Sequence, residues 1–441
     1  MKLLIEPKQN NLNEAQIHIN GAKNALLPLL FSTPLVDGKT SFTNVPLQLK
    51  DYQGSKKILT RLGLTFEEGQ DRVQILNNGL VQEADLPSSL TKATRCSLYL
   101  LGSAAKKNGH IAIGLPGGCS FGRERRFDLH LDGLRALNAE VRVENGLISI
   151  RHLRDIDVQH TLAFPSVGAT TNLILYATLG HKEVILSNCA VEPEIINLIN
   201  FLNQCGAKIA VDTIHREVVV QGVTSLHASE MKLIPDRIQI MTYVVLAMMH
   251  KKRLHLKGVT SLGNLQTPLQ SLVELGLTYD YQPKEGILII HGDQLTSFKG
   301  LEMVCQPYPG FPTDLQPIFA MLGLVANSAG TIKDNVIPER TAYLDEIMKL
   351  GAEVMYKDRG ILTQPINETL KGAAMCCTDL RGGMACVMAA SVANGPSIIS
   401  NADQVFRGYD NLLDNLSHFM HVTHLEKEQM VTALNVQNQV A

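Results

Sequence analysis

Residues 166–175, SVGATTNLIL, decide the fold: they begin with small and polar residues and continue into an apolar run. Related stretches recur at intervals of about 70 residues, longer than most solenoid repeats. They are GAKNALLPLL at 21–30, TRCSLYLLG at 94–102, PDRIQIMTYVV at 235–245, PTDLQPIFAML at 312–322 and TDLRGGMACVM at 378–388. A helix that is apolar almost all round lies buried inside its domain. The sequence therefore predicts six repeats, each built on one buried helix.

Each of these stretches leads into a predicted strand, a second helix and a β-hairpin. In LGLTFEEGQDRVQIL at 62–76, a glycine that can end a helix precedes residues that alternate through a turn, as in a hairpin. Similar endings are LNAEVRVENGLISI at 137–150, CGAKIAVDTIHREVVV at 205–220, LGLTYDYQPKEGILII at 275–290 and LGAEVMYKDRGILT at 350–363. The sixth ending, after Phe419, is degraded. The expected fold class is α/β.

The chain has 441 residues, too many for one ordinary core, so the six repeats are expected to form two domains of three. We expect the break near residues 230–234. The first domain would then cover residues 22–233, and the second would cover residues 1–21 plus 234–441. The strand-like segments MKLLIE and AQIHI, which precede the first repeat, are expected to return to the second domain.

The composition excludes several function classes. Lys plus Arg number 40 against 42 Asp plus Glu, so the chain lacks the general positive charge that attracts nucleic acid or membrane surfaces. The N-terminal apolar run breaks at Glu6 and Pro7, unlike a signal peptide, and no apolar run is long enough to span a membrane. We therefore expect a cytoplasmic protein without membrane or nucleic-acid partners. The eight cysteines show no zinc-binding spacing and are expected to be free, with no metal site.

Residues 115–130, LPGGCSFGRERRFDLH, carry the strongest chemical signal. Two glycines give the backbone freedom, and three arginines offer forked donors that suit phosphate or carboxylate oxygens. Cys119 would lie in a field of positive charge that favours its thiolate, as a nucleophile or a proton carrier. A solvated loop with a buried cysteine is the alternative reading of this stretch alone.

Other candidate residues stand at the starts of the repeat helices, where unpaired N–H groups and the helix dipole favour anions. Several such helix ends meeting in a cleft would form an anion site between the domains. Lys23 and Asn24 start the first helix, and a lysine there opposes the dipole unless a negative ligand binds. The corresponding residues in later repeats are Arg95, Ser166, Val167, Gly168, Asp236, Arg237, Asp314, Asp379 and Arg381, and Arg340 and Arg407 follow in the last two. Ordinary helix caps and solvated side chains are the alternative.

Taken in order, GAKNALLP, TRCSLYLLG, LPGGC followed by DLH, SVGAT, EPEI, PDRI, FPTD, TDLR and RGY resemble the UDP-N-acetylglucosamine enolpyruvyl transferases. The match spans almost the whole chain. The resemblance implies a two-domain inside-out α/β barrel with three βαβαββ repeats per domain around buried parallel helices, and a Cys loop that acts as a lid. It implies transfer of enolpyruvate from phosphoenolpyruvate to the 3-hydroxyl of UDP-N-acetylglucosamine, with release of phosphate, as the first committed step of peptidoglycan synthesis. No metal or organic cofactor is implied.

The resemblance also implies roles for individual residues. Cys119 would be the general acid that protonates the methylene carbon of phosphoenolpyruvate, and Asp314 would receive the proton of the sugar hydroxyl. The phosphate and carboxylate clamp would consist of Lys23, Arg125 and Arg407, supported by Arg95 and Arg381. The remaining substrate-binding residues would be Asn24 at the sugar, Asp128, Leu129, His130, Ser166, Val167 and Gly168 at the uridine diphosphate, and Val336.

Three positions depart from the family's pattern. Phe164 stands where a lysine is usual, Val191 where an arginine is usual, and Gln239 where a glutamate is usual. Loss of two cations weakens the expected hold on the diphosphate. A paralogue that acts on a different nucleotide or nucleotide sugar is therefore the first alternative. A non-catalytic member that binds a nucleotide sugar is the alternative from another class.

Two segments depart in length or order. The loop between Cys119 and Asp128 is one residue longer than usual, so counting from Cys119 places Glu124 where counting back from Asp128 places Arg125. We match the clamp residue from the Asp128 side. The polar tail KEQMVTALNVQNQVA at 427–441 is expected to be frayed.

Overall fold

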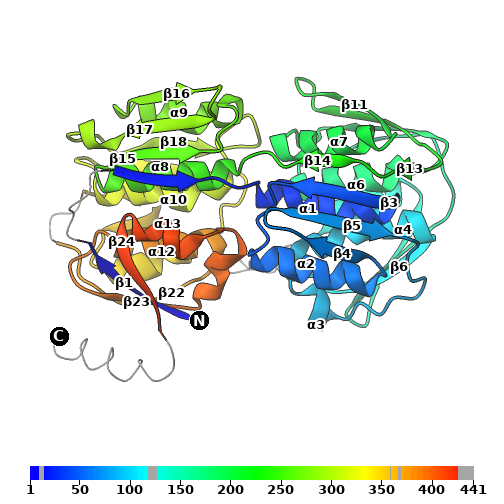
Figure 1. The fold of residues 1–441 in the computed structure, drawn as a ribbon, viewed down its shortest axis with the longest axis horizontal. Coiled ribbons are helices and arrows are strands. Elements are labelled where there is room, and N and C mark those ends of the chain that lie inside the picture. The colour runs from blue at the N-terminus through cyan, green and yellow to red at the C-terminus, as the bar shows by residue number, and fades with distance from the viewer. Residues whose placement is uncertain (9–13, 118–126, 358, 366–368, 426–441) are drawn as a thin grey trace. The chain divides into compact units, whose positions relative to one another are not determined.

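A computed structural model of the chain describes residues 1–8, 14–117, 127–357, 359–365 and 369–425. Two compact units emerge, each with its own hydrophobic core (Figure 1). Unit 1 comprises Met1–Ile19 and the residues from Arg237 onward, and unit 2 extends from Asn20 to Asp236.

Unit 2 contains the first three repeats, and each follows the expected order of helix, strand, helix and hairpin. The first repeat comprises α1 (Lys23–Ser32), β3 (Val36–Thr43), α2 (Lys50–Arg61), β4 (Thr65–Glu68) and β5 (Arg72–Asn77). The second comprises η2 (Arg95–Leu101), α4 (Ser103–Asn108), β6 (His110–Gly114), α5 (Asp128–Ala136), β7 (Ala139–Glu144) and β8 (Leu147–His152). The third comprises α6 (Val167–Thr178), β10 (Glu183–Ser187), α7 (Pro193–Gln204), β11 (Lys208–Asp212) and β12 (Glu217–Gln221).

Unit 1 contains the last three repeats. The fourth comprises α8 (Arg237–Met249), β15 (Arg253–Lys257), α9 (Gln266–Val273), β16 (Tyr279–Gln282) and β17 (Ile287–His291). The fifth comprises α10 (Gln316–Ala320), β19 (Gly330–Asp334), α11 (Tyr343–Met348), β20 (Val354–Lys357) and β21 (Gly360–Thr363). The sixth comprises α12 (Leu380–Ala390), β23 (Ser397–Ser400), η7 (Ala402–Arg407), α13 (Leu412–Ser417) and β24 (Met420–Leu425).

Five of the six sheets in the described residues share one strand pattern, and the sheet of β6, β8 and β7 lacks the parallel strand. In unit 2, β9 (Val158–Thr161) runs parallel to β10, and β12 and β11 follow antiparallel. In unit 1, β18 (Glu302–Cys305) likewise runs parallel to β19, and β21 and β20 follow antiparallel. In these two sheets the parallel strand directly precedes the buried helix of its repeat, and the antiparallel pair is the hairpin that ends the repeat. A βαβαββ repeat is the result, as expected.

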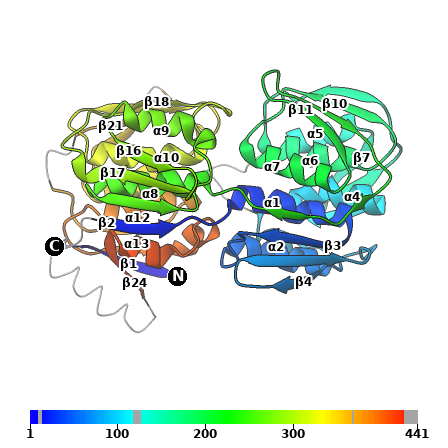
Figure 2. The same ribbon diagram turned by 45° about the horizontal axis from the view of Figure 1, so that its top comes forward.

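The N-terminal strands join unit 1. Strand β1 (Lys2–Pro7) lies between β23 and β24, antiparallel to both, and replaces the hairpin strand that the sixth repeat lacks (Figure 1). Strand β2 (Glu14–His18) runs parallel to β15 and lies beside the green strands of the fourth repeat in Figure 2. Conversely, β14 (Glu230–Lys232), which precedes the fourth repeat in sequence, pairs with β3 of unit 2.

The repeat helices form the cores. All residues of α8 and α12 are buried, as are all of α6 from Ala169 onward. Figure 2 shows α6 surrounded by α5, α7 and strands of unit 2. These helices lack the polar face of a surface helix and are apolar almost all round, as their sequences predicted. Within the described ranges, none of the helices is both long and apolar enough to cross a membrane.

Two repeats open differently from the expected continuous helix. In the second, residues 95–101 form the 3₁₀ helix η2, and α4 starts only after Gly102. Close packing explains the break, because a Cβ built on Gly102 would lie 2.3 Å from the carbonyl oxygen of Asn172 in α6. In the fifth, α10 has five residues and leads directly into the 3₁₀ helix η6 (Met321–Leu324).

Candidate active site

Lys23 is the first residue of α1 and is buried, with Nζ 3.3 Å from Oδ2 of Asp51 in α2. Its backbone N–H donates to Oδ2 of Asp236 at 3.2 Å, although Asp236 lies 213 residues further along the chain. Both carboxylates are buried. Two anions therefore meet the N-terminus of α1, and they offset the unfavourable position of a lysine at that end of the dipole. Asn24 follows, half-buried.

Arg95 begins η2 and is half-buried. The pKa of the neighbouring Cys96 thiol depends on the charges around it. Burial raises the pKa of Cys96 to about 11, while Lys23 opposes the increase and Asp51 adds to it. The second repeat helix therefore starts close to the Lys23–Asp51 pair.

The candidate nucleotide residues of unit 2 meet where α5 and α6 begin. Asp128 is exposed at the start of α5, Leu129 is half-buried, and His130 is buried. The side chain of Ser166 caps α6 by accepting from the N–H of Ala169 at 3.3 Å, and Val167 and Gly168 form its first turn. His130 packs on that turn, because a Cβ on Gly168 would lie 2.8 Å from His130 Nε2. The structure thus brings DLH and SVG together.

In unit 1, Asp314 is held by two buried arginines. Arg340 Nη2 donates to Oδ1 at 3.1 Å, and Arg381 donates to Oδ2 from Nε at 3.3 Å and from Nη2 at 3.2 Å. The arginine side chains are 4% and 2% exposed, whereas that of Asp314 is 26% exposed. The two buried arginines therefore fix the carboxylate, and part of it remains accessible to solvent. Arg340 also donates to the carbonyl oxygen of Thr313 at 2.7 Å.

Further carboxylates favour the charged form of Arg340. Burial lowers the pKa of Arg340, but Asp314, Asp379 and Asp334 more than compensate and raise it overall. Asp379 caps α12 by accepting from the N–H groups of Arg381 and Gly382. The Arg381 guanidinium lies 5.2 Å from the ring centre of Tyr409. A charged, preorganised carboxylate of this kind suits proton abstraction from a neutral hydroxyl.

The remaining predicted residues of unit 1 lie on neighbouring turns. Arg407 ends η7, is half-buried, and donates to Oε1 of Gln404 at 2.9 Å. The N–H of Val336 donates to Oδ1 of Asp334 at 2.8 Å, while Thr313 Oγ1 donates to Oδ2 of Asp334 at 2.6 Å. Asp334 therefore ties the turn at Val336 to the residue that precedes Asp314.

Several expectations fall outside the described residues. Cys119 and Arg125 do so, together with Glu124 and the tail from residue 426. The three positions that depart from the family's pattern are described. Phe164 is half-buried ahead of α6, and Val191 and Gln239 are buried.

Sequence reasoning missed two polar partners. Asp51 was not singled out, although it holds Lys23, and Asn172 was not singled out, although its Nδ2 lies 3.2 Å from Nδ1 of His130. Asp236 was assigned to the start of a helix in the second domain, but it belongs to unit 2 and binds the start of α1. No local pattern marks these residues, because each contact joins residues that are far apart in the sequence.

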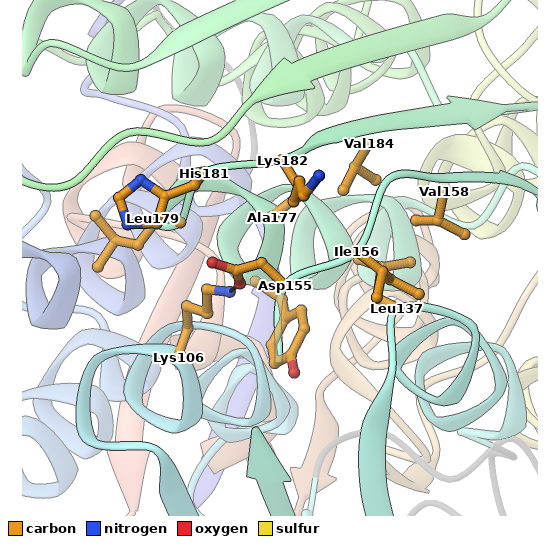
Figure 3. Close-up of a pocket in the computed structure, with 12 residues that line it drawn as sticks. Lys106, Leu137, Asp155, Ile156, Val158, Ala177, Leu179, His181, Lys182 and Val184 are labelled. Carbon is orange, nitrogen blue, oxygen red and sulfur yellow. Dashed lines mark hydrogen bonds and ion pairs between the residues drawn. The ribbon is translucent and has the colours of Figure 1, made fainter. Parts of the chain in front are cut away.

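A separate pocket lies at the opposite end of α6 from Ser166 (Figure 3). Its empty volume is about 280 Å³, partly open to solvent, and Ile156, Val158 and Val184 line one side. On the other side, Lys106 and Asp155 form an ion pair. The Asp155 carboxylate also lies 3.3 Å from His152 Nε2, and His152 Nδ1 lies 2.7 Å from the Tyr176 hydroxyl. These polar groups satisfy one another, which is typical of a structural network.

Cysteines and metal ligands offer little further chemistry in the described part of the chain. Burial raises the pKa of Cys189, Cys205 and Cys377 to about 12, so these thiols are poor nucleophiles at neutral pH. The seven cysteines that the structure describes are free. Among the same residues there is no group of three or more His, Cys, Asp or Glu placed to hold a metal ion.

Comparisons with known proteins match almost the whole chain. The family model of EPSP synthase (3-phosphoshikimate 1-carboxyvinyltransferase) matches residues 7–416. UDP-N-acetylglucosamine 1-carboxyvinyltransferase from Halothermothrix orenii is 34% identical over 414 residues, covering 93% of this chain and 96% of that protein. The enzyme of the same name from Thermotoga maritima is 33% identical over 418 residues, covering 94% and 97%.

Solved structures with low sequence identity share the fold. The enolpyruvyl transferase NikO from Streptomyces tendae superimposes with a TM-score of 0.85 at 20% identity, covering 96% of this chain and 99% of that one. EPSP synthase from Acinetobacter baumannii gives a TM-score of 0.72 at 16% identity, covering 97% and 100%. The family model and the sequence relatives show that this chain belongs to the EPSP synthase family of enolpyruvyl transferases, among the UDP-N-acetylglucosamine 1-carboxyvinyltransferases.

Proposed function

We propose that this chain transfers the enolpyruvyl group of phosphoenolpyruvate to the 3-hydroxyl of UDP-N-acetylglucosamine and releases phosphate. Relatives that carry this activity in their names are about one third identical over more than nine tenths of the chain. The observation that carries the proposal is the Asp314 carboxylate, fixed by Arg340 and Arg381 and partly exposed. A base held in this way is what the reaction requires at the hydroxyl.

The reaction would proceed by addition and elimination. Asp314 would take the proton of the sugar 3-hydroxyl while the oxygen of that hydroxyl forms a bond to C2 of phosphoenolpyruvate. Cys119 would give a proton to the methylene carbon. In the second step, the bond between C2 and the phosphate oxygen would break, the methyl group formed would return a proton to the Cys119 thiolate, and the phosphate would leave with the proton held by Asp314. The products are the enol ether and inorganic phosphate, so no oxidant or metal is consumed.

Cations would stabilise the phosphate and carboxylate of phosphoenolpyruvate. Lys23, Arg95 and Arg125 would serve from unit 2, and Arg381 and Arg407 from unit 1. Lys23 is held by the buried carboxylate of Asp51, and Arg381 is held by the partly exposed carboxylate of Asp314, so both cations are positioned before substrate binds. Such preorganised charge lowers the cost of rearrangement during the reaction.

The sugar nucleotide would bind mainly through unit 2. Asn24 would contact the sugar, and the DLH and SVG segments would contact the uridine diphosphate, with Val336 of unit 1 as a further contact. Helix N-termini bind phosphate groups through their N–H donors, and Ser166 already caps α6. The protein would act in the cytoplasm on precursors of peptidoglycan, without nucleic-acid partners.

The test is phosphate release from phosphoenolpyruvate with UDP-N-acetylglucosamine, with mass analysis of the nucleotide product. The expected product is heavier by one enolpyruvyl group. Asp314→Asn and Cys119→Ala should abolish its formation, whereas Asp132→Asn, at an exposed ion pair, should leave it unchanged. Release of phosphate without a heavier nucleotide would contradict the proposal.

A different nucleotide acceptor is the second candidate, because Phe164 and Val191 replace the cations that are usual in the family. Buried Val191 offers no charge to a diphosphate. An assay of phosphate release with a panel of uridine nucleotides and nucleotide sugars distinguishes UDP-N-acetylglucosamine from a different acceptor. Preference for another acceptor by tenfold or more in kcat/KM would favour the paralogue. Binding without release across the panel would favour a non-catalytic protein.

A further inference from the structure

Asp334 ends β19 and is 7% exposed, and each oxygen of its carboxylate binds a different segment of unit 1. Oδ1 accepts from the N–H groups of Val336 and Ile337 at 2.8 Å and 2.9 Å. Oδ2 accepts from the hydroxyl of Thr313 at 2.6 Å. An ionised carboxylate can only accept hydrogen bonds, so the direction of all three is fixed by the chemistry of the partners.

The pairing of strands explains why Asp334 meets Thr313. Cys305, the last residue of β18, lies opposite Asp334 in the parallel pair of β18 and β19. The chain then closes a loop, because the N–H of Gln306 donates to the carbonyl oxygen of Phe311 at 3.0 Å. Thr313 follows two residues later and therefore lies beside the carboxyl end of β19.

The position of Asp314 depends on Thr313, the residue before it in the short 3₁₀ helix η5 (Thr313–Leu315). A single 3₁₀ turn has few hydrogen bonds of its own and keeps its shape through its neighbours. Asp334 holds the Thr313 hydroxyl, and Arg340 Nη1 donates to the Thr313 carbonyl oxygen at 2.7 Å. Without the bond from Asp334, Thr313 would be held through its backbone alone, and the peptide that carries Asp314 could turn.

We propose that Asp334 is a positioning residue for the reaction. Through Thr313 it fixes the backbone that carries the Asp314 base. Through two backbone N–H groups it fixes the turn at Val336, the residue assigned to the sugar nucleotide. One buried carboxylate thus relates the base to the bound sugar without touching substrate. The proposal rests on the proposed function for the identity of the reaction, whereas the contact between Thr313 and Asp334 does not.

The first test removes only the arm toward the base and measures steady-state phosphate release. Thr313→Val keeps the size of the side chain but loses the hydroxyl, and should lower kcat about 10-fold through misplacement of Asp314. KM for both substrates should change less than about twofold, since the turn at Val336 keeps its bonds to Asp334. Thr313→Ser keeps the hydroxyl and should restore most of kcat. An unchanged kcat in Thr313→Val would overturn the proposal.

Binding of UDP-N-acetylglucosamine by calorimetry checks that the lower kcat is not a loss of folded protein. Thr313→Val should bind with the stoichiometry and affinity of the unmodified protein. A stoichiometry that falls in proportion to kcat would mean that the variant is partly unfolded, and would contradict a positioning role.

The second test changes Asp334 itself. Asp334→Ala removes both arms, so it should lower kcat at least about 10-fold and also raise KM for the sugar nucleotide about threefold or more. In Asp334→Asn the side-chain oxygen must face the two backbone N–H groups, and the amide can then donate to the Thr313 hydroxyl. This variant should keep most of kcat. If it loses as much as Asp334→Ala, the charge of Asp334 and not its hydrogen bonds matters, and the proposal is wrong.

Asp212→Ala is the matched control. Oδ1 of Asp212 accepts from the N–H groups of Ile214 and His215 at 2.8 Å and 2.9 Å, the same turn at an exposed hairpin of unit 2. Loss of this turn should leave kcat and both KM values unchanged. An effect equal to that of Asp334→Ala would show that the kinetic changes come from general destabilisation.

A double-mutant cycle followed by urea unfolding tests the contact without substrate. Thr313→Val should shift the folding equilibrium about 5- to 10-fold toward the unfolded state in the unmodified protein, but less than about twofold in Asp334→Ala. Equal shifts would show that the hydroxyl and the carboxylate do not interact.

The outcomes distinguish the inference from the proposed function. If the unmodified protein releases no phosphate with any acceptor, the proposed function is wrong, and the role of Asp334 in it is overturned as well. If the unmodified protein is active and Thr313→Val and Asp334→Ala keep its kcat, only the positioning role is wrong.

Discussion

Arg381 gives two hydrogen bonds to one oxygen of Asp314, from Nε at 3.3 Å and from Nη2 at 3.2 Å, across 67 residues of sequence. A guanidinium fork can hold a carboxylate in one orientation in a way that a lysine ammonium cannot. The other oxygen is left for Arg340. The direction of the Asp314 carboxylate is therefore set by two arginines from later in the chain.

Replacing the Arg381 guanidinium should lower the rate of the reaction more than the stability of the fold. We expect Arg381→Lys to lower kcat by roughly 10- to 100-fold, because a small misplacement of a catalytic group has an effect of that size. Steady-state phosphate release measures the effect. Arg142→Lys is the control, since Arg142 pairs with Glu140 on the surface and should change kcat little. An unchanged kcat in Arg381→Lys would show that the second arginine alone positions the base.

The ion pair beside the pocket in unit 2 should matter for stability. Lys106 is 7% exposed, and its removal leaves the half-buried carboxylate of Asp155 without its closest cation. Lys106→Met should lower the free energy of unfolding by about 3 kcal/mol. The adjacent Lys107, which pairs with a more exposed Asp37, provides a matched control, and Lys107→Met should cost less than about 1 kcal/mol. Urea unfolding compares them, and similar losses for both would contradict the argument.

The stability of unit 1 should fall in acid because of His250. Burial, and then Lys252, lower the pKa of His250 to about 4, and its Nε2 lies 2.8 Å from Ser391 Oγ. The unfolded chain therefore binds a proton near pH 6.5, before the folded protein does. The stabilisation is fully present above pH 6.5 and is lost as the pH falls toward 4. It amounts to roughly 3 kcal/mol.

Unfolding measured at pH 7.5 and at pH 5 checks this expectation. His250→Gln removes the titrating group, and should reduce the loss of stability between the two pH values. His215 is the control, because it is exposed and Asp212 raises its pKa, so His215→Gln should not reduce the loss. A pH dependence that is the same in His250→Gln would assign the acid sensitivity to other groups.

The start of α1 should depend on a residue outside its own repeat. Asp236 accepts from the N–H of Lys23 and so serves as the cap that Ala22, the residue at the N-cap position, cannot provide. Asp236→Ala should lower the free energy of unfolding by about 0.5–2 kcal/mol, and Asp236→Asn by less, because asparagine also caps helices. Thermal unfolding of the two variants measures the difference. Equal losses would mean that charge rather than capping makes the contribution.

Much of the fold was predictable from local patterns. Apolar residues all round a helix, as in Arg237–Met249, indicate burial whatever the helix packs against, and alternation around a turn indicates a hairpin. Because the first pattern recurs six times and the second five times, the sequence by itself determined the number of repeats, their order of elements and the return of the N-terminal strands to unit 1. The ordered motifs also pointed to the family that the comparisons show.

Only the tertiary structure decided the polar partners. Asp51 at Lys23, Asn172 at His130 and Arg381 at Asp314 come from different helices, and no spacing rule links the members of these pairs. Their contacts depend on how helices pack, which is set by details such as the missing side chain at Gly102. Local propensity and periodicity act over a few residues, whereas an ion pair or a hydrogen bond between side chains depends on groups that meet only after the chain has folded.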